Sequence, residues 1–392
     1  MNILYVTLEN LSLRKGSVTH IKEIVNGFRK NGHEVGLVAR GTAPIHEADV
    51  FYNIRSGDER GAGNLRAYFT SALRLFFRLT KITGRYDLVY ARDYHATVLA
   101  YLPCVLFRRR LIFEINGLAS EEQRLKKDSF MSRVAVFLIG QAEKAATRAA
   151  DRIISVTPQI ATYLLDRYRC KQEKIEIVGN GVNTGKFYPI QDESVLSACR
   201  ARVGIRSGDK VLVFVGNLAR WQGIETLIEC SVELLLRNDG LKFLIVGGGP
   251  VEAALLEKAR KAGVEKSFIF TGMVDYEEVP IYINIGDIGV APFIAKRNTL
   301  TGVSPLKIFE YMACGKSVVA SRIEGLEFVE EEGIGRLVAP GVVRDFTEAL
   351  SSLLWDDVAR AEMGKKASRI VFERFSWASK AERIQSILQK MA

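Results

Sequence analysis

The sequence predicts an α/β protein with two doubly wound parallel sheets, one in each half of the chain. Apolar runs of about five residues alternate with longer stretches in which apolar residues recur at helical spacing. This series starts a second time after residues 179–189, which are rich in Gly and Asn and therefore indicate a linker. Strands that alternate with helices form βαβ units, so we expect two Rossmann-like domains. The 392 residues are enough for two such cores.

The first series predicts a domain over residues 1–183. Its expected strands are Ile3–Val6, Val35–Ala39, Leu88–Tyr90, Leu111–Ile115, Arg152–Val156 and Ile175–Val178. Its expected helices include Thr19–Lys30, Leu65–Lys81, Phe130–Ala149 and Pro158–Tyr168.

The second series predicts a domain over residues 184–372. Its expected strands are Lys210–Val215, Leu241–Val246, Ser267–Phe270, Ile288–Ala291 and Ser317–Ala320, with helices at Gly223–Arg237 and Pro250–Ala262. The last segment, residues 373–392, is expected to be a helix that Ser376 opens. Because it follows the completed second sheet, it must pack on another surface.

Composition narrows the class of protein. Apolar residues make up 48% and charged residues 26%, which is typical of a soluble globular protein. The first residues read as a strand and not as a signal peptide, and no apolar window is long enough to span a membrane. The five scattered cysteines contain no CxxC pair, so we expect free thiols in a reducing compartment. These features predict a cytoplasmic protein.

Positive charge is concentrated in the first half of the chain. Residues 1–186 hold 29 Lys and Arg against 18 Asp and Glu, a net +11, whereas the remainder is close to neutral. Such a field attracts an anionic partner, for example an acidic membrane surface, a phosphorylated lipid or nucleic acid. A merely basic surface is the alternative.

Residues 301–320 carry the sharpest local signal. Ser304 is a good N-cap and Pro305 suits the first helical position, so we expect a helix that Gly315 ends. A helix start after a glycine-containing loop offers free N–H groups to a diphosphate, and Lys307 adds a charge. Glu310, about one turn further, is placed to accept hydrogen bonds from ribose hydroxyls. An ordinary capped helix with solvated charges is the alternative.

This stretch resembles the signature of the retaining glycosyltransferases of family 4, which have the glycosyltransferase-B architecture of two Rossmann-like domains facing a cleft. In that family a Glu-x₇-Glu pair precedes a Met-Ala-x-Gly-x-Pro-Val-Val-Ala run. Glu310 matches the second glutamate, and Met312, Ala313, Gly315 and residues 318–320 match the run. The resemblance implies that Glu310 holds the ribose of a nucleotide-sugar donor.

Weaker blocks in the family's order extend the resemblance over nearly the whole chain. They are Lys15-Gly16-Ser17, Gly27–Val35, Val215–Gly223, Leu244–Pro250, Phe270–Val274 and Phe375–Trp377, the last of which resembles the helix that returns to the first domain. The donor contacts that the resemblance implies are Gly16, Ser17, Asn217, Arg220, Gln222, Gly272, Val274, Gly302, Val303, Ser304, Pro305, Leu306, Lys307 and Glu310.

The sequence departs from the family pattern at the donor site. Gly302 stands where the first glutamate faces the transferred sugar, so we expect backbone N–H groups of residues 302–306 to hold the sugar. Asn217 and Gln222 replace the Arg and Lys that clamp the diphosphate. Developing negative charge still needs a cation, and we expect Lys307, ahead of Arg220, to supply it.

Candidate acceptor contacts lie in the first half. A family histidine is Asn116 here, which hydrogen-bonds but is no base, whereas Glu114 could act as one or form an ion pair. His20 follows the Gly16 block, and Arg92, Asp93 and His95 follow a strand at the edge where ligands bind. The acceptor contacts that we predict are His20, Arg92, His95, Glu114 and Asn116, and the catalytic residues are Lys307, Glu310 and Asn116.

We expect no metal and no resident cofactor. The sequence has no Asp-x-Asp pair and no HxxxH spacing, and its glycine-rich turn at Gly247 is not GxGxxG. His33 is expected to be structural.

Two features suggest a membrane nearby. Residues 66–85 mix five cations with apolar residues, which predicts either a basic amphipathic helix on a bilayer or a core helix with a solvated face. Residues 108–110 and 124–127 add further cations. We therefore expect a peripheral position on the inner face of the cell membrane, where lipid-linked acceptors reside.

The resemblance implies a metal-independent hexosyltransferase that retains configuration and serves cell-surface polysaccharide or glycoconjugate synthesis. The donor would be a UDP-sugar and the acceptor a glycan or lipid-linked molecule. A nucleotide-sugar epimerase and a non-catalytic nucleotide-sugar-binding protein on the same fold are the alternatives. A nucleic-acid partner is not expected, because no recognition motif accompanies the charge.

Overall fold

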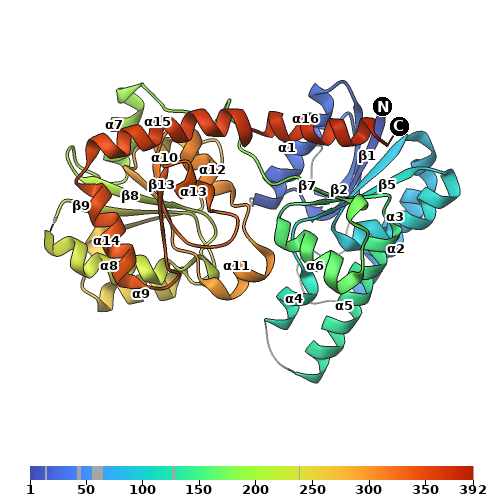
Figure 1. Cartoon of the computed structure of the whole chain (residues 1–392), viewed down its shortest axis with the longest axis horizontal. Coiled ribbons are helices and arrows are strands. Elements are labelled where there is room, and N and C mark those ends of the chain that lie inside the picture. Colours follow the sequence, from blue (N-terminus) through green and yellow to red (C-terminus); the bar gives the residue numbers. More distant parts are fainter. Residues whose placement is uncertain (14–15, 42–45, 55–64, 126–128, 238, 392) are drawn as a thin grey trace. The chain divides into compact units, whose positions relative to one another are not determined.

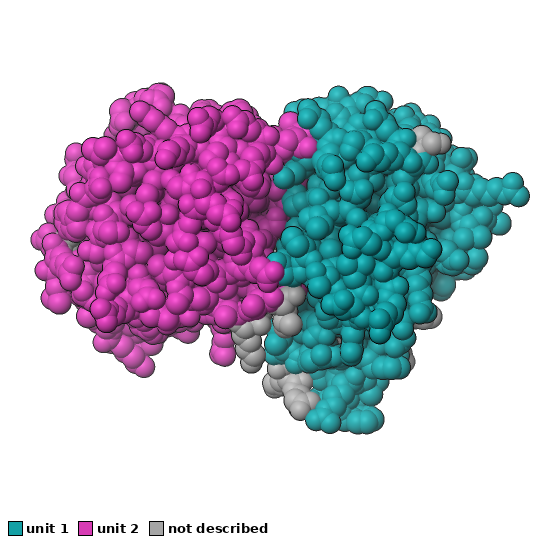
Figure 2. Space-filling view, in the orientation of Figure 1, with its two compact units in different colours: residues 1–179, 380–392 teal, residues 180–379 magenta. Residues whose placement is uncertain are grey.

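The computed structural model describes residues 1–13, 16–41, 46–54, 65–125, 129–237 and 239–391. Two compact units divide the chain, as Figure 2 shows in two colours. The first unit holds Met1–Gly179 together with Lys380–Ala392, and the second holds Asn180–Ser379. The division after Gly179 lies at the start of the Gly- and Asn-rich segment in which the sequence placed the linker.

The first unit contains a seven-stranded sheet in the order β3-β2-β1-β4-β5-β6-β7, and every pairing in it is parallel. Its strands are β1 (Asn2–Asn10), β2 (Glu34–Arg40), β3 (Val50–Asn53), β4 (Leu88–Arg92), β5 (Arg110–Ile115), β6 (Arg152–Ser155) and β7 (Ile175–Ile177). The order runs outward in both directions from β1 and β4, which makes the sheet doubly wound. This confirms the predicted fold of the first half.

Helices join these strands, as Figure 1 shows. They are α1 (Gly16–Lys30), α2 (Leu65–Ile82), α3 (Asp93–Phe107), α4 (Ala119–Arg124), α5 (Phe130–Ala149) and α6 (Pro158–Tyr168). Helix α1 begins at Gly16, three residues before its predicted start, so Gly16 and Ser17 belong to the first turn of a helix and not to a loop. Strand β3 escaped prediction because it is a short, half-exposed edge strand.

The second unit contains a six-stranded parallel sheet in the order β10-β9-β8-β11-β12-β13. Its strands are β8 (Lys210–Val215), β9 (Leu241–Val246), β10 (Phe268–Gly272), β11 (Ile288–Ala291), β12 (Ser317–Ser321) and β13 (Gly335–Val338). Its helices are α7 (Glu193–Arg202), α8 (Ile224–Arg237), α9 (Glu252–Lys261), α10 (Val279–Asn284), α11 (Ala295–Thr301), α12 (Leu306–Ala313), α13 (Phe328–Glu331), α14 (Val343–Leu354) and α15 (Asp357–Arg374).

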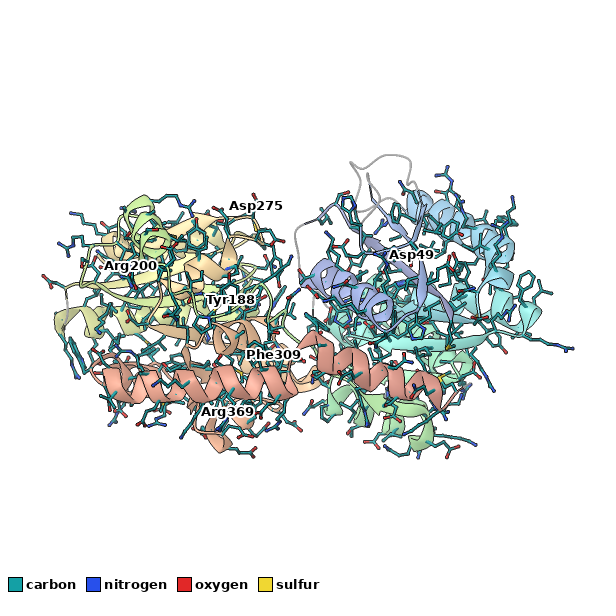
Figure 3. All side chains as sticks on the ribbon, turned by 90° about the horizontal axis from the view of Figure 1, so that it is seen from above. Asp49, Tyr188, Arg200, Asp275, Phe309 and Arg369 are labelled. Carbon is teal, nitrogen blue, oxygen red and sulfur yellow. The ribbon has the colours of Figure 1, made fainter. Side chains whose placement is uncertain are left out.

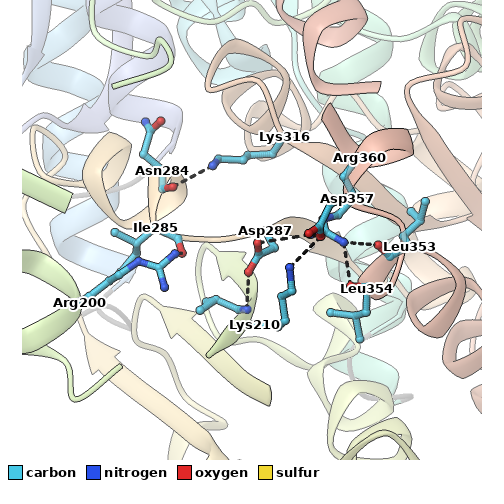
Figure 4. A network of polar contacts seen from close by, with 11 residues as sticks. Arg200, Lys210, Asn284, Ile285, Asp287, Lys316, Leu353, Leu354, Asp357 and Arg360 are labelled. Carbon is cyan, nitrogen blue, oxygen red and sulfur yellow. Dashed lines mark hydrogen bonds and ion pairs between the residues drawn. The ribbon is translucent and has the colours of Figure 1, made fainter. Parts of the chain in front are cut away.

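A polar network fastens α15 to the second sheet at the end opposite the candidate donor site (Figure 4). The buried Arg360 donates to the carbonyl oxygens of Leu353 and Leu354 and lies 3.7 Å from the Asp287 carboxylate. Asp287 in turn accepts from the Val211 N–H at 2.7 Å, at the start of β8. The network satisfies buried polar groups and so supports the fold.

The chain crosses from the second unit into its last helix, α16 (Trp377–Gln389), beside the linker. Val182 exchanges backbone hydrogen bonds with Phe375 and Trp377, and Phe375 stacks on Phe309 with ring centroids 4.8 Å apart (Figure 3 labels Phe309). Ser376 accepts from the Ser379 N–H, so it caps α16 as predicted. Within the first unit, His33 contacts Gln385, which fits its predicted structural role.

Candidate donor and acceptor sites

Three loops meet at the carboxyl ends of β8, β9 and β10 in the second unit. Leu218 N–H donates to the Gly248 carbonyl at 3.0 Å, and Gly247 N–H donates to that of Gly272 at 3.1 Å. A Cβ on Gly247 would lie 2.1 Å from the Gly216 carbonyl oxygen, so this approach requires glycine. The glycines thus give the backbone a close-packed edge where ligands of parallel sheets bind.

Helix α12 presents its first turn to the same edge. Tyr311 anchors it, because its hydroxyl accepts from the Val215 N–H at 2.8 Å and donates to the Val290 carbonyl at 3.3 Å. These contacts tie α12 to the ends of β8 and β11. Lys307 and Glu310, one turn apart on α12, are therefore held in fixed positions.

Lys307 is buried against aromatic rings. Its ammonium donates to Gln222 Oε1 at 2.7 Å and lies 3.7 Å from the centre of the Phe214 ring. Burial lowers the pKa of Lys307 well below its usual value, although the charge on Glu310 acts in the opposite direction. By the resemblance, Gln222 stands where the family usually has a cation. Here it is the hydrogen-bond partner of Lys307, the cation that we expected to take over that role.

Glu310 is also buried, and its Oε1 accepts from the Tyr276 hydroxyl at 3.1 Å. Burial raises the pKa of Glu310 to about 7, against the opposing effects of Tyr276 and Lys307. The sequence offered no signal for Tyr276 or Phe214, because each reaches the site through tertiary packing. A carboxyl with such a pKa is typical of a ligand-binding or catalytic position.

The predicted cap of α12 is wrong. The helix begins at Leu306, Pro305 is its N-cap residue, and no side chain caps it. Ser304 Oγ instead accepts from the Asn180 N–H at 2.8 Å, while the Asn180 amide donates to the Ser304 carbonyl at 2.6 Å. The Ser304 hydroxyl therefore bonds to the linker residue Asn180 instead of capping α12. As a result, the first N–H groups of α12 have no side-chain cap.

Gly302 has backbone angles that only glycine adopts readily. Its φ is 62° and its ψ is −177°. The position that the resemblance pairs with the first glutamate thus has a backbone that favours glycine here, and it carries no carboxylate. Val303 follows it, and its N–H donates to the Glu324 carbonyl at 3.3 Å.

The remaining predicted donor residues of the second unit lie at the end of β10 and in the segments that follow β8 and β10. Asn217 and Arg220 are exposed in the loop after β8, Gly272 ends β10 with a φ of 66°, and Val274 is partly buried just beyond it. Gly16 and Ser17 belong to the first unit, and Lys15 lies outside the described residues.

A buried charge cluster occupies the carboxyl end of β5 in the first unit. Glu114 accepts from the Tyr90 hydroxyl at 2.6 Å and from the Asn116 amide, and it lies 2.8 Å from His20 Nε2. Arg92 Nε lies 3.8 Å from the same carboxylate. Burial alone would raise the pKa of Glu114, but the contacts with His20, Arg92 and Asn116 lower it to about 2. Glu114 is thus an ion-pair residue and a poor base.

Arg92 connects the cluster to the start of α1. Its Nη1 donates to the Ser17 carbonyl at 2.8 Å, so β4 and the first turn of α1 are held together. Asp93 follows with a φ of 71°, a strained value for a residue with a side chain, and burial raises its pKa to about 6. The structure thus joins His20, Arg92, Glu114 and Asn116 in one cluster.

His95 lies in the first turn of α3. Its ring packs against that of Tyr94 with centroids 3.6 Å apart and an angle of 34° between the ring planes, and burial lowers the pKa of His95 to about 4. Across the described ranges, no group of three or more His, Cys, Asp or Glu side chains is arranged to hold a metal ion. None of the helices in those ranges is long and apolar enough to cross a bilayer.

Comparisons with known proteins agree with this architecture. The profile of "Glycosyltransferase Family 4" matches residues 14–186, and that of "Glycosyl transferases group 1" matches residues 209–356. A D-inositol 3-phosphate glycosyltransferase of Corynebacterium glutamicum is 27% identical over 391 residues, which are 95% of this chain and 91% of that protein. An uncharacterized glycosyltransferase of Methanocaldococcus jannaschii is 23% identical over 81% of this chain and 78% of its own.

Solved structures share the fold over the whole chain. Sucrose-phosphate synthase of Thermosynechococcus elongatus has a TM-score of 0.80 at 19% identity and covers 100% of this chain and 98% of its own. HepE of Anabaena, in complex with UDP, has a TM-score of 0.78 at 20% identity, with 100% of both chains covered. With two family profiles that together span both units, the chain belongs to the family 4, or group 1, glycosyltransferases.

Proposed function

We propose that this glycosyltransferase is a retaining, metal-independent hexosyltransferase that uses a UDP-sugar. The observation that carries the proposal is the pair Lys307 and Glu310, both buried on the first turns of α12 at the carboxyl edge of the second sheet. A diphosphate needs a cation and N–H groups, and a ribose needs an acceptor of hydrogen bonds. The similar HepE structure is a complex with UDP, which favours uridine as the base.

In this proposal the uncapped start of α12 binds the diphosphate. Its N–H groups carry partial positive charge, and Lys307 adds a full charge once it is protonated. Glu310 accepts from the ribose hydroxyls, and the glycine-rich loops before and after β10 provide backbone groups for the base. Without a carboxylate at Gly302, the transferred sugar contacts the backbone of residues 302–306.

Transfer with retention then proceeds on one face of the sugar. The bond between the anomeric carbon and the diphosphate oxygen breaks as the acceptor oxygen bonds to the same carbon from the same side. The acceptor's proton passes to the leaving diphosphate oxygen. Lys307 stabilises the negative charge that develops on the leaving group. No step of this scheme requires a metal ion or a protein base.

We place the acceptor against the charge cluster of the first unit. Asn116 and His20 present hydrogen-bonding groups to a sugar hydroxyl, while Arg92 and Glu114 hold them in position. A glycan or lipid-linked acceptor of cell-surface polysaccharide or glycoconjugate synthesis fits this arrangement. The basic first half of the chain supports a cytoplasmic protein that lies on the inner face of the cell membrane.

A thermal-shift titration with UDP, GDP and ADP tests the donor assignment. A ligand at 100 times its dissociation constant stabilises the folded state by about 2.7 kcal/mol, so binding raises the melting temperature visibly. We expect UDP to do so without magnesium, and Glu310→Ala to abolish the rise. A rise that survives in Glu310→Ala, or that appears only with magnesium, would contradict the proposal.

A non-catalytic nucleotide-sugar-binding protein is the second candidate. It is favoured by Gly302 in place of a carboxylate and by the exposed Asn217 in place of a cation. Single-turnover measurements with UDP-glucose and a panel of glycan and lipid-linked acceptors separate the two. UDP release that depends on an acceptor supports the transferase, release without one supports an epimerase or hydrolase, and binding without turnover supports the non-catalytic protein.

A further inference from the structure

A cavity of about 380 Å³ lies between α4, α5 and α6 in the first unit. The described residues that line it include four cations, Arg124, Arg133, Lys144 and Arg167, and no carboxylate. The lining shares no residue with the candidate acceptor cluster. Gly140 of α5 leaves the cavity open, because a Cβ there would meet only the Tyr168 hydroxyl and Ser120 Cβ, at 3.8 and 3.9 Å.

Two buried carboxylates behind the cavity fix its walls. Glu143 of α5 accepts from the Ala119 N–H and the Tyr168 hydroxyl, both at 2.7 Å, and so ties α4 and α6 to α5. Glu121 of α4 accepts from the Tyr163 hydroxyl at 2.8 Å and lies 3.2 Å from Arg124. These contacts join the three helices that carry the four cations of the cavity, so the cations are held on helices that are already in place.

An exposed apolar stripe runs along α5 beside the cavity. Its residues are Phe130, Met131, Val134, Phe137 and Leu138, which lie on one side of the helix at the positions i, i+1, i+4, i+7 and i+8. Phe130 is 79% exposed, Met131 74%, Phe137 63% and Leu138 59%. Phe137 also lines the cavity, so the apolar stripe and the cations are continuous. Contiguous apolar surface of this kind marks an interaction site.

We propose that this cavity binds the phosphoryl group of an anionic membrane lipid while the stripe on α5 enters the boundary of the bilayer. Cations beside exposed aromatic and aliphatic side chains match a surface in which a phosphate layer adjoins hydrocarbon. Nucleic acid would use the cations but leave the apolar stripe in water. In Figure 1, α4, α5 and α6 lie together in the first unit, and α5 extends away from its sheet.

The proposal moves the membrane surface away from α2, where the sequence had suggested it. Leu75, Leu79 and Ile82 of α2 pack in the core of the first unit, and only Leu73 and Phe77 among its large apolar residues with described side chains are exposed, at 46% and 55%. Helix α2 is thus mainly a core helix with a basic outer face. The proposal concerns membrane binding and does not depend on the donor assignment.

Sedimentation of the full chain with vesicles tests the proposal. We expect binding to vesicles of phosphatidylcholine mixed with phosphatidylglycerol and little binding to phosphatidylcholine alone. The double variant Arg133→Gln with Lys144→Gln should weaken binding by about fivefold for each cation removed, since a basic residue near an anionic surface contributes about 1 kcal/mol. The control Lys365→Gln with Lys366→Gln removes the same charge from exposed positions of α15 and should leave binding unchanged.

Two further variants separate the cavity from a general field. Gly140→Leu fills the cavity without changing charge and should also weaken binding. The double variant Phe137→Ser with Leu138→Ser should also weaken binding to vesicles. The control Leu236→Ser with Phe372→Ser changes exposed positions of the second unit and should leave binding unchanged. The melting temperature of each variant without ligand, compared with that of the wild type, shows that the variant is folded.

Four outcomes would overturn the proposal. If the α15 control lost as much vesicle binding as the Arg133→Gln with Lys144→Gln variant, the attraction would be a diffuse electrostatic one. Unchanged binding in Gly140→Leu would show that the cavity takes no headgroup. A rise in melting temperature with inorganic pyrophosphate that Gly140→Leu removes, without any binding to vesicles, would assign the cavity to a free phosphate compound. Tighter binding to duplex RNA than to vesicles would assign it to nucleic acid.

Discussion

The Lys307 ammonium donates to Gln222 Oε1 at 2.7 Å while it lies over the ring of Phe214. This hydrogen bond gives a structural role to Gln222, which in the sequence seemed only to remove a cation from the donor site. Gln222 stands where related sequences carry a lysine, yet it holds the buried lysine from α12 at the edge where the diphosphate is proposed to bind. A second cation at position 222 would repel Lys307, so the glutamine suits the site.

Lys307→Met should abolish UDP binding without destabilising the empty protein. Burial disfavours the ammonium, and a methionine of similar size avoids that cost, so the melting temperature without ligand should stay equal or rise. The rise with UDP should disappear, as differential scanning fluorimetry can measure. A variant that retains the UDP-induced rise would show that the diphosphate lies elsewhere.

The pH dependence of stability should report the same lysine. Its folded pKa is depressed, so the unfolded chain binds more protons, and stability rises with pH between the folded pKa and the ordinary pKa of lysine, 10.5. Urea denaturation of the wild type across this range should show that rise, and Lys307→Met should flatten it. An identical slope in both proteins would assign the effect to other groups.

UDP affinity should follow a bell-shaped pH profile. Glu310 accepts ribose hydroxyls best when ionised, so affinity should rise as pH increases through about 7, the pKa of Glu310. Affinity should fall again where Lys307 loses its proton, and the pH of that fall reports the depressed pKa of the lysine. Calorimetric titrations should show Glu310→Gln without the acidic limb and Lys307→Met without the basic limb. A flat profile in the wild type would contradict both assignments.

Glu114→Gln should cost stability at neutral pH and much less in acid. The pKa of Glu114 lies at about 2 instead of the usual 4.5, so its ion pairs stabilise the fold above the ordinary pKa and the benefit is lost as pH falls toward 2. The shift corresponds to roughly 3 kcal/mol at neutral pH. Urea denaturation at neutral and acidic pH measures the difference between the two proteins, which should shrink as the pH is lowered.

Gly302→Ala should reduce both stability and donor binding. A side chain at its φ and ψ costs on the order of 1–3 kcal/mol, or shifts the backbone before α12. Gly341→Ala is the matched control, because Gly341 also has a positive φ, 75°, and a Cβ there meets no atom within 4 Å. It should lose stability but keep its affinity for UDP. Equal affinities in both variants would remove Gly302 from the donor site.

The sequence predicted the two parallel sheets because most of their strands are short, buried apolar runs. Strands β8, β9 and β11 and helices α5 and α6 have the predicted bounds, since each is ended by turn residues or a cap. Helix α3 was not predicted because it is apolar on nearly all sides and contains Pro103. Its apolar residues therefore show no helical period from which a helix could be predicted. Strand β3 was missed because it is a short edge strand.

By itself the sequence determined the fold class, and it predicted the linker and the residues of α12 that we propose for the donor, because each of these depends on local pattern and spacing. Only the tertiary structure decided the charge states and partners of those residues. Burial beside Phe214 and Tyr276 shifts the pKa values of Lys307 and Glu310. The linker residue Asn180 donates to the Ser304 hydroxyl, which the local sequence had predicted to cap the helix. Desolvation and hydrogen bonds between residues far apart in the chain exist only once the chain has packed, so no local pattern contains them.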